Sequence, residues 1–282
     1  MTSDTGWTAD HYRLFRGLFG GYLFVHFVHL LPWGTELFSS QGMVGIAADS
    51  PLVFLFPNIL GVLDSPAFVT LFLLSGAAAA VCFAAGVRDK WAALWCWYVL
   101  ACLFGGNPLI QNPSLPYVGW MLLAHLAIPA TTAAGWRMPR HVYAAGWVVL
   151  ALSYSYSGWT KLMSASWRDG SMLGYVLQNP LARDSALREF ILSLPPGLLQ
   201  GITFAILWIE FLFVFLALSR RLRPWAWGAM LIVQFGFAFL LDFADLTFAM
   251  LLFHLFTFDP AWVAPAREPE QEEIALGSGS AA

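Results

Sequence analysis

The sequence predicts an all-α protein, a polytopic integral membrane bundle of about eight transmembrane helices with its N- and C-termini in the cytoplasm. Composition, the number of apolar segments and the distribution of basic residues support this prediction. Hydrophobic residues make up 59% of the 282 residues and charged residues 11%, and the mean hydropathy is +0.67. Soluble domains average about 45–50% apolar and about 25% charged residues. The composition therefore indicates a lipid environment.

The apolar segments are numerous enough for a bundle, since one helical span needs about 20 apolar residues. Eight spans are predicted, at 14–33, 66–86, 91–106, 117–134, 141–158, 198–218, 224–241 and 243–258. The first segment follows polar residues and is expected to be a retained span, not a cleaved leader. The stretch Pro51 to Leu63 is apolar but is interrupted by Pro57 and Asn58, so we expect an interfacial or re-entrant segment there.

The basic residues give the predicted orientation, because Lys and Arg favour the cytoplasmic ends of spans. With the N-terminus inside, ten of the 14 fall on the cytoplasmic side, namely Arg13, Arg16, Arg88, Lys90, Arg137, Arg140, Arg220, Arg221, Arg223 and Arg267. The other four, Lys161, Arg168, Arg183 and Arg188, belong to one extracytoplasmic loop at 158–197. Nothing resembles the basic patch of a nucleic-acid-binding protein.

The chain is predicted to form one transmembrane domain over 1–263. Its long loop at 158–197 contains an apolar-periodic piece near Ser185 to Leu194, which we expect to form an interfacial helix. Residues 264–282 are acidic and then small, and we expect a disordered tail because such a composition buries little apolar area. The cysteines match neither a metal motif nor a disulfide framework: Cys82, Cys96 and Cys102.

Lys161 is one of two lysines in the chain and follows the fifth apolar segment. A lysine at a helix end commonly snorkels, with its stem in the acyl region and its ammonium at the headgroups. Here the preceding Ser155, Tyr156 and Ser157 make the segment polar, and Gly158 permits close backbone approach. Removal from water disfavours the charged form of an amine, and a neutral amine can act as a base, a role that arginine cannot fill.

Glu210 lies near the middle of the sixth segment, in L-W-I-E-F-L. An unpaired charged carboxylate at the centre of a span costs about 2.5–3.5 kcal/mol on insertion scales. Two interpretations stay open: a protonated acid bonded to a neighbouring helix, or a buried partner for a base or a substrate. In either case the side chain should face the interior of the bundle.

The segment Ser157 to Gly170, with S-G-W-T-K-L followed by S-W-R-D-G, resembles the signature of the HTTM family, membrane domains related to vitamin K-dependent gamma-glutamyl carboxylase. The segments L-F-R-G-L-F-G-G, W-I-E-F-L and R-R-L-R-P-W agree in order, so that the resemblance extends from about Leu14 to Pro260. The family often has a histidine where this chain has Q-N-P-S-L-P, and another at the position of Gln234.

The resemblance implies a single HTTM-like domain and a specific chemistry. In the carboxylase the matching lysine deprotonates vitamin K hydroquinone, and oxygen then converts the quinol to an epoxide through a strongly basic alkoxide. That alkoxide removes the gamma proton of a glutamate so that carbon dioxide can add. By this resemblance Lys161 would be the initiating base. Glu210 is a candidate for its buried partner because of its position in the sixth segment. The implied cofactor is a reduced quinone, vitamin K hydroquinone or menaquinol, with CO2 and O2 as co-substrates and no metal.

Other residues are predicted to line the site from the same membrane side. They are Asn112 and Ser114 of the amide-rich loop before the fourth span, with Tyr156, Trp159, Trp167, Gln234 and His29. His26 and His29 share a helix face, as three-residue spacing requires, and polar packing or a quinone contact fits them better than a metal, which would need further ligands. His125 and His254 are expected to be structural, and Asp242 and Asp245 are interpreted as loop charges.

The sequence leaves two functions open. The first is a carboxylase-like membrane enzyme that uses a reduced quinone to modify a glutamate-containing or exported peptide. The second is a non-enzymatic helper or binding module for a secreted peptide, in which Lys161 only pairs with a carboxylate. For both, we expect a protein of the bacterial inner membrane whose site faces the extracytoplasmic side.

Overall fold

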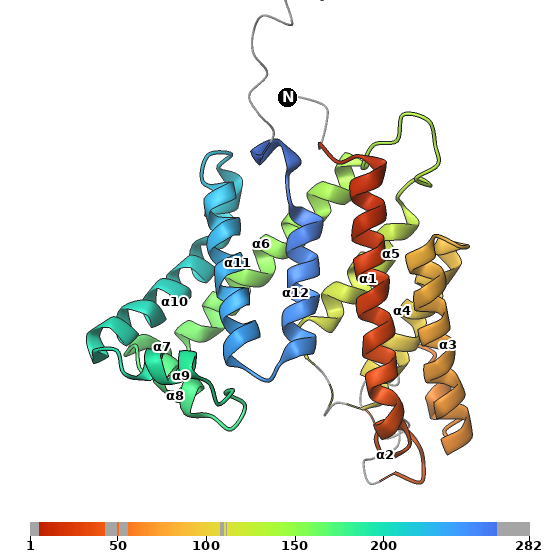
Figure 1. Ribbon diagram of the computed structural model, residues 1–282, viewed down its shortest axis with the longest axis horizontal. Coiled ribbons are helices and arrows are strands. Elements are labelled where there is room, and N and C mark those ends of the chain that lie inside the picture. The colour runs from red at the N-terminus through yellow and green to blue at the C-terminus, as the bar shows by residue number, and fades with distance from the viewer. Residues whose placement is uncertain (1–5, 43–49, 51–55, 108–109, 111, 264–282) are drawn as a thin grey trace, which may run out of the picture.

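The computed structural model describes residues 6–42, 50, 56–107, 110 and 112–263, and this part of the chain is all helical, without a β-strand (Figure 1). The α-helices are α1 (Ala9–Leu30), α2 (Gly34–Phe38), α3 (Pro66–Ala85), α4 (Asp89–Gly106), α5 (Leu115–Leu126), α6 (Arg140–Leu162), α7 (Ala165–Arg168), α8 (Met172–Gln178), α9 (Ala186–Leu192), α10 (Pro196–Leu218), α11 (Arg223–Leu240) and α12 (Ala244–Thr257). Short 3-10 turns are η1 (Leu31–Trp33), η3 (Ile59–Gly61) and η5 (Pro260–Trp262).

Each of the eight apolar segments contains a helix, and three helical segments are long and apolar enough to cross a membrane. These are Ala9–Phe38, Pro66–Ala85 and Pro196–Leu218, while α5 and α12 are shorter apolar helices. The largest difference from the predicted bounds is in the segment 117–134, where α5 ends at Leu126. Pro129 explains the early end, because a proline disfavours helical geometry at the residue before it.

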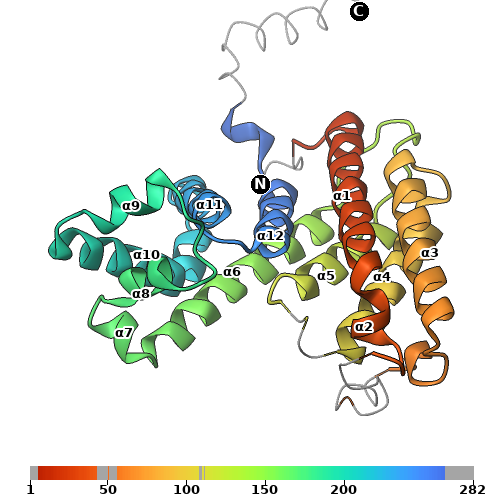
Figure 2. The same ribbon diagram turned by 60° about the horizontal axis from the view of Figure 1, so that its bottom comes forward.

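The helices form two groups with α12 between them, as Figures 1 and 2 both show. In the first group α1 packs on α3, α3 on α4 and α4 on α5, and in the second α10 packs on both α6 and α11. The helix α12 contacts α1 and α5 on one side and α6 and α11 on the other. The two groups therefore meet mainly through α12.

The connections alternate between two ends of the bundle (Figure 1). One end, called the basic end below, has the start of α1, the α3–α4, α5–α6 and α10–α11 connections and the end of α12. The basic residues predicted to share one side lie in or beside these segments, apart from Arg267, which is outside the described residues. The opposite end, called the outer end, has α2, the segment α7 to α9 and the α11–α12 turn.

The predicted loop at 158–197 is largely helical, because α6 continues to Leu162 and α7, α8 and α9 follow it. The helix α9 lies within the apolar-periodic piece predicted near Ser185 to Leu194. In the predicted re-entrant stretch, residues 51–55 are outside the described residues, while Asn58 is buried and its Nδ2 donates to the carbonyl of Cys102 at 2.9 Å. The predicted disordered tail, 264–282, is also outside the described residues.

Close packing of α1 on α3 depends on a glycine. Buried aromatic and aliphatic side chains recur every four residues on this face of α1: Phe15, Phe19, Leu23 and Phe27. A Cβ atom at Gly20 would lie 2.6 Å from the Cβ of Ala84 and 2.9 Å from the carbonyl oxygen of Ala80. The neighbouring Gly21 is exposed, and a Cβ there would meet nothing within 4 Å.

Gly20→Ala is expected to lower the free energy of unfolding by about 1–3 kcal/mol, since the added methyl forces α1 away from α3. Gly21→Ala is the matched control and should be neutral or stabilise by up to about 1 kcal/mol, because alanine favours a helix over glycine. Thermal unfolding of both variants in detergent checks this. Equal midpoints for the two variants would contradict the close packing.

Candidate functional site

The helices α6 and α10 approach each other closely at Gly158. A Cβ atom at this position would lie 2.5 Å from the Cα of Phe211 and 2.9 Å from the carbonyl carbon of Glu210, both backbone atoms of α10. One turn earlier on α6, Ser155 Oγ accepts a hydrogen bond from the backbone N–H of Val214 at 2.9 Å. No side chain larger than hydrogen fits at residue 158 unless the two helices separate.

Lys161 and Glu210 form an ion pair across this contact. The predicted span ends at residue 158, but α6 continues to Leu162, which places Lys161 in the last helical turn, one turn from Ser157. Its Nζ also donates to Ser157 Oγ at 3.0 Å and lies 5.0 Å from the centroid of the Trp167 ring. The amine thus has an anionic, a hydroxyl and an aromatic neighbour.

Glu210 is the buried member of the pair. Its side chain is 3% exposed and that of Lys161 is 19% exposed, so the amine faces the outer end while the carboxylate is shielded. Burial of a carboxylate is costly unless it is paired or protonated. The pair therefore satisfies the shielded carboxylate, and Lys161 is the partner with more exposed surface.

The W-R-D-G motif covers the end of α7, where Trp167 lies beside Lys161, and the turn that leads to α8. Asp169 Oδ1 accepts hydrogen bonds from the Ser171 hydroxyl at 2.6 Å and from the Ser171 N–H at 2.9 Å. These two hydrogen bonds hold the pKa of Asp169 below its ordinary value. Gly170 has a φ of +80°, a conformation that glycine adopts without strain.

The other aromatic candidates lie on outward faces near the pair. Trp159 is 53% exposed and its ring stacks on Phe211 with centroids 6.4 Å apart. Tyr156 is 70% exposed, and within the described part of the chain no hydrogen bond or ring contact joins it to Lys161. Both present apolar surface beside the α6–α10 contact.

Gln234 belongs to a buried network behind the pair. Its Nε2 donates to the hydroxyl of Tyr154 at 3.0 Å, and that hydroxyl lies 3.4 Å from Nε2 of His254. His254 also contacts the Met250 carbonyl at 3.0 Å through Nδ1. The network connects α6, α11 and α12 by hydrogen bonds. Amide side chains often connect helices in this way in membrane proteins.

Asn112 and Ser114 belong to a second cluster, centred on Asp245 in the first turn of α12. Asp245 accepts hydrogen bonds from the hydroxyl of Tyr22 at 2.9 Å and from Nδ2 of Asn112 at 2.7 Å, and its Oδ1 lies 2.8 Å from Nδ1 of His26. Asn112 Oδ1 in turn accepts from the Ser114 hydroxyl at 2.5 Å. The loop interpretation of Asp245 is corrected, because its carboxylate connects three parts of the chain.

His29 lies apart from both clusters. It is exposed on α1, one turn beyond His26, and the residue of this pair that contacts a carboxylate is His26. In the described part of the chain, no group of three or more His, Cys, Asp and Glu side chains could hold a metal ion.

The basic end has a network of its own that the sequence did not predict. Arg16, 7% exposed, lies 3.1 Å from Oδ2 of Asp89, and His125 lies 3.3 Å from the same oxygen through Nε2. The other ring nitrogen of His125 is 2.6 Å from the Tyr12 hydroxyl. Arg16 and His125 belong to different predicted segments and Asp89 to the connection between two others, so that neither spacing nor composition related them.

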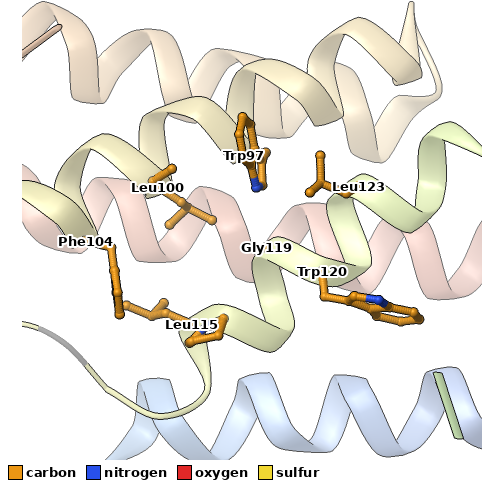
Figure 3. Close-up of a pocket in the computed structure, with 9 residues that line it drawn as sticks. Trp97, Leu100, Phe104, Leu115, Gly119, Trp120 and Leu123 are labelled. Atoms are coloured by element: carbon orange, nitrogen blue, oxygen red, sulfur yellow. The ribbon is translucent and has the colours of Figure 1, made fainter. Parts of the chain in front are cut away.

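The surface also has an apolar groove of about 300 Å³ between α4 and α5 (Figure 3). Its lining includes Trp97, Leu100, Phe104, Leu115, Gly119 and Leu123. Figure 3 shows the Trp97 ring pointing from α4 toward Gly119. No ionisable side chain lines the groove, and Lys161 and Glu210 are on α6 and α10, outside it.

Comparison of the chain with known protein families, with curated proteins and with solved structures gives no match.

Lys161→Met and Glu210→Gln are expected to show a coupling free energy of about 1–3 kcal/mol in a double-mutant cycle, as residues in direct contact do. Each single change removes the partner of an ionisable group, whereas the double variant removes both. Thermal unfolding in detergent measures the cycle. Strictly additive effects would mean that the pair adds nothing to the α6–α10 contact.

Asp245→Asn is expected to destabilise the protein by about 1–3 kcal/mol, because hydrogen bonds to a charged acceptor are stronger than those to a neutral one. Asp242→Asn is the matched control: its carboxylate is 69% exposed and pairs with Arg183 at 3.2 Å, so we expect less than about 1 kcal/mol. The same unfolding assay compares the two. A larger loss of stability for Asp242→Asn than for Asp245→Asn would contradict the central role of Asp245.

Proposed function

We propose that this chain is an integral protein of the bacterial inner membrane with about eight spans, both termini in the cytoplasm and a site facing the extracytoplasmic side. Three helical segments meet the length and composition of a span. The helices α4, α6 and α11 add 18, 23 and 18 residues, and the shorter α5 and α12 complete the eight. The gathering of basic connections at one end supports the orientation, because such connections stay cytoplasmic.

Within this membrane protein we propose a carboxylase-like activity in which Lys161 is the base. The substrate classes are a reduced quinone, vitamin K hydroquinone or menaquinol, and a glutamate-containing or exported peptide, with CO2 and O2 as co-substrates. The observation that supports this proposal most directly is the contact of Lys161 with the buried Glu210 at the outer end of α6.

The pair can perform the first proton transfer with its own atoms. With the proton on the buried Glu210 carboxyl, the Lys161 amine is neutral, and the lone pair on Nζ can accept the hydroxyl proton of a ligand. The ammonium so formed is stabilised by the Ser157 hydroxyl at 3.0 Å and by the face of Trp167.

The surroundings of the pair fit a quinone in chemical type. Exposed aromatic side chains flank the α6–α10 contact, namely Tyr156, Trp159 and Trp208, and offer apolar surface to a ligand arriving within the bilayer. A reduced quinone, when bound, would supply a dissociable hydroxyl and the reducing equivalents for reaction with O2. Lys161, 19% exposed, is the ionisable group within reach of such a ligand.

A second candidate is a non-enzymatic helper for a secreted peptide. One observation favours this candidate: Lys161 already has a carboxylate partner within the chain, Glu210. The ion pair alone would then account for the presence of a lysine at this position. In this candidate Lys161 joins α6 to α10 and performs no chemistry.

Lys161→Arg separates the two candidates. Arginine keeps the positive charge and its pairing with Glu210, but it cannot act as a base near neutral pH. We therefore expect Lys161→Arg to lose quinol oxidation and to lose the modification of a glutamate-containing peptide, which is seen as an increase in peptide mass. Its thermal midpoint should stay close to that of the parent protein. Lys90→Arg is the matched control and should retain activity, because Lys90 lies at the basic end and donates to the Leu126 carbonyl. Full activity in Lys161→Arg would reject the base.

The lipid that co-purifies with the chain provides an independent readout. Mass spectrometry of detergent-solubilised protein should detect menaquinone or its epoxide, and Trp159→Ala should reduce the amount, since it removes the exposed ring beside the pair. Absence of any quinone from active protein would contradict the proposed cofactor.

A further inference from the structure

The turn between α10 and α11 presents positive charge to its surroundings. Arg220 and Arg221 are both exposed, and within the described part of the chain neither side chain has a hydrogen-bond or ion-pair partner. Arg223 differs, because its Nε donates to the Ala217 carbonyl at 2.7 Å and its guanidinium lies 5.1 Å from the Trp147 ring centroid. Two of the three arginines therefore remain available to an external anion.

An apolar groove begins directly after this turn. It runs along α11, has a volume of about 590 Å³ and is lined by Pro224, Trp225, Gly228, Ala229, Ile232 and Trp262. A Cβ atom at Gly228 would meet nothing within 4 Å, so the floor of the groove is open there. Trp225 is 79% exposed, which is typical of a tryptophan at a membrane interface.

The charge beside the groove favours an anion. The start of α11 lies at the same place, and the N-terminus of a helix carries partial positive charge. The residue that caps η5, Asp259, is acidic, and its Oδ1 accepts a hydrogen bond from the Ala261 N–H at 3.0 Å. The α4–α5 groove differs, since no charged residue occurs in the stretches 96–105 and 114–124 that line it.

We propose that this groove binds an acyl chain of an anionic glycerophospholipid whose phosphate is held by Arg220 and Arg221. The inference rests on the proposed membrane location and is independent of the chemistry at Lys161. Guanidinium groups match phosphate oxygens in a bidentate geometry, and the groove extends from the phosphate position toward the middle of α11, as an acyl chain would. Basic pockets beside spans on the cytoplasmic side bind anionic headgroups in this way.

Titration of the detergent-purified full chain with three probes tests the proposal: phosphatidylglycerol, phosphatidylcholine of the same chain length, and inorganic phosphate. Binding is followed by native mass spectrometry and by the thermal midpoint. We expect phosphatidylglycerol to bind more tightly than phosphatidylcholine. Arg220→Gln or Arg221→Gln should weaken phosphatidylglycerol binding about fivefold and the double variant about 30-fold.

The groove itself is tested by Gly228→Leu, which fills the open floor and should remove binding of both lipids. Two control variants should leave the preference for phosphatidylglycerol unchanged. Gly119→Leu fills the α4–α5 groove, and Arg168→Gln removes an exposed arginine from the outer end.

Several results would overturn the proposal. Equal affinity for the two lipids would remove the role of the arginines, and phosphate binding as tight as that of phosphatidylglycerol would indicate an anion site without an acyl chain. Lipid binding that appears only after deletion of residues 264–282 would identify the acidic tail as the occupant. A chain that stays in solution without detergent would contradict the membrane location itself, whereas a detergent-dependent chain without lipid preference would contradict this inference alone.

Discussion

The packing of α12 between two helix groups is the constraint on which the rest of the structure depends. Its last carbonyl groups, which no helix can satisfy internally, accept hydrogen bonds from aromatic donors of both groups. Trp227 Nε1 donates to His254 O at 3.1 Å, the Tyr143 hydroxyl to Thr257 O at 3.0 Å, and Trp7 Nε1 to the following Phe258 O at 2.9 Å. At the other end the Asp245 cluster connects the same helix to α1 and to the loop before α5. Polar contacts thus fix both ends of a helix that is otherwise apolar.

The Lys161 and Glu210 pair depends on a different constraint, the close approach of α6 and α10. A buried ion pair is weak evidence for stability, since desolvation offsets much of its attraction. In the proposed activity the shielded carboxyl would hold a proton and the more exposed amine would exchange one with a ligand, so that the unequal exposure of the two partners would give the transfer a direction.

Much of the fold could be predicted from the sequence, because apolar segments of sufficient length identify helices and basic residues identify their ends. For Glu210, residue type and depth left two interpretations open, one of them a buried partner for a base, and in the structure it pairs with Lys161. The sequence could not show that Asn112 and Ser114 join Asp245 and not Lys161. Helical periodicity tells which face of a helix is buried but not which helix covers it. Asp242 and Asp245 look alike in sequence, although Asp242 is exposed and Asp245 contacts Tyr22, His26 and Asn112. The same limit applies to Arg16, Asp89 and His125.

For the proposed membrane protein, the polar face of α6 has a consequence for how the chain would enter a bilayer during synthesis. With 23 residues α6 is long enough to span, yet it is absent from the helices whose composition alone favours a span, whereas α10 is among them. Ser155 and Lys161 find their partners, Val214 and Glu210, on α10, which the ribosome makes about 50 residues later. Stable insertion of α6 would therefore wait for α10, and the two helices would enter the lipid phase as a pair.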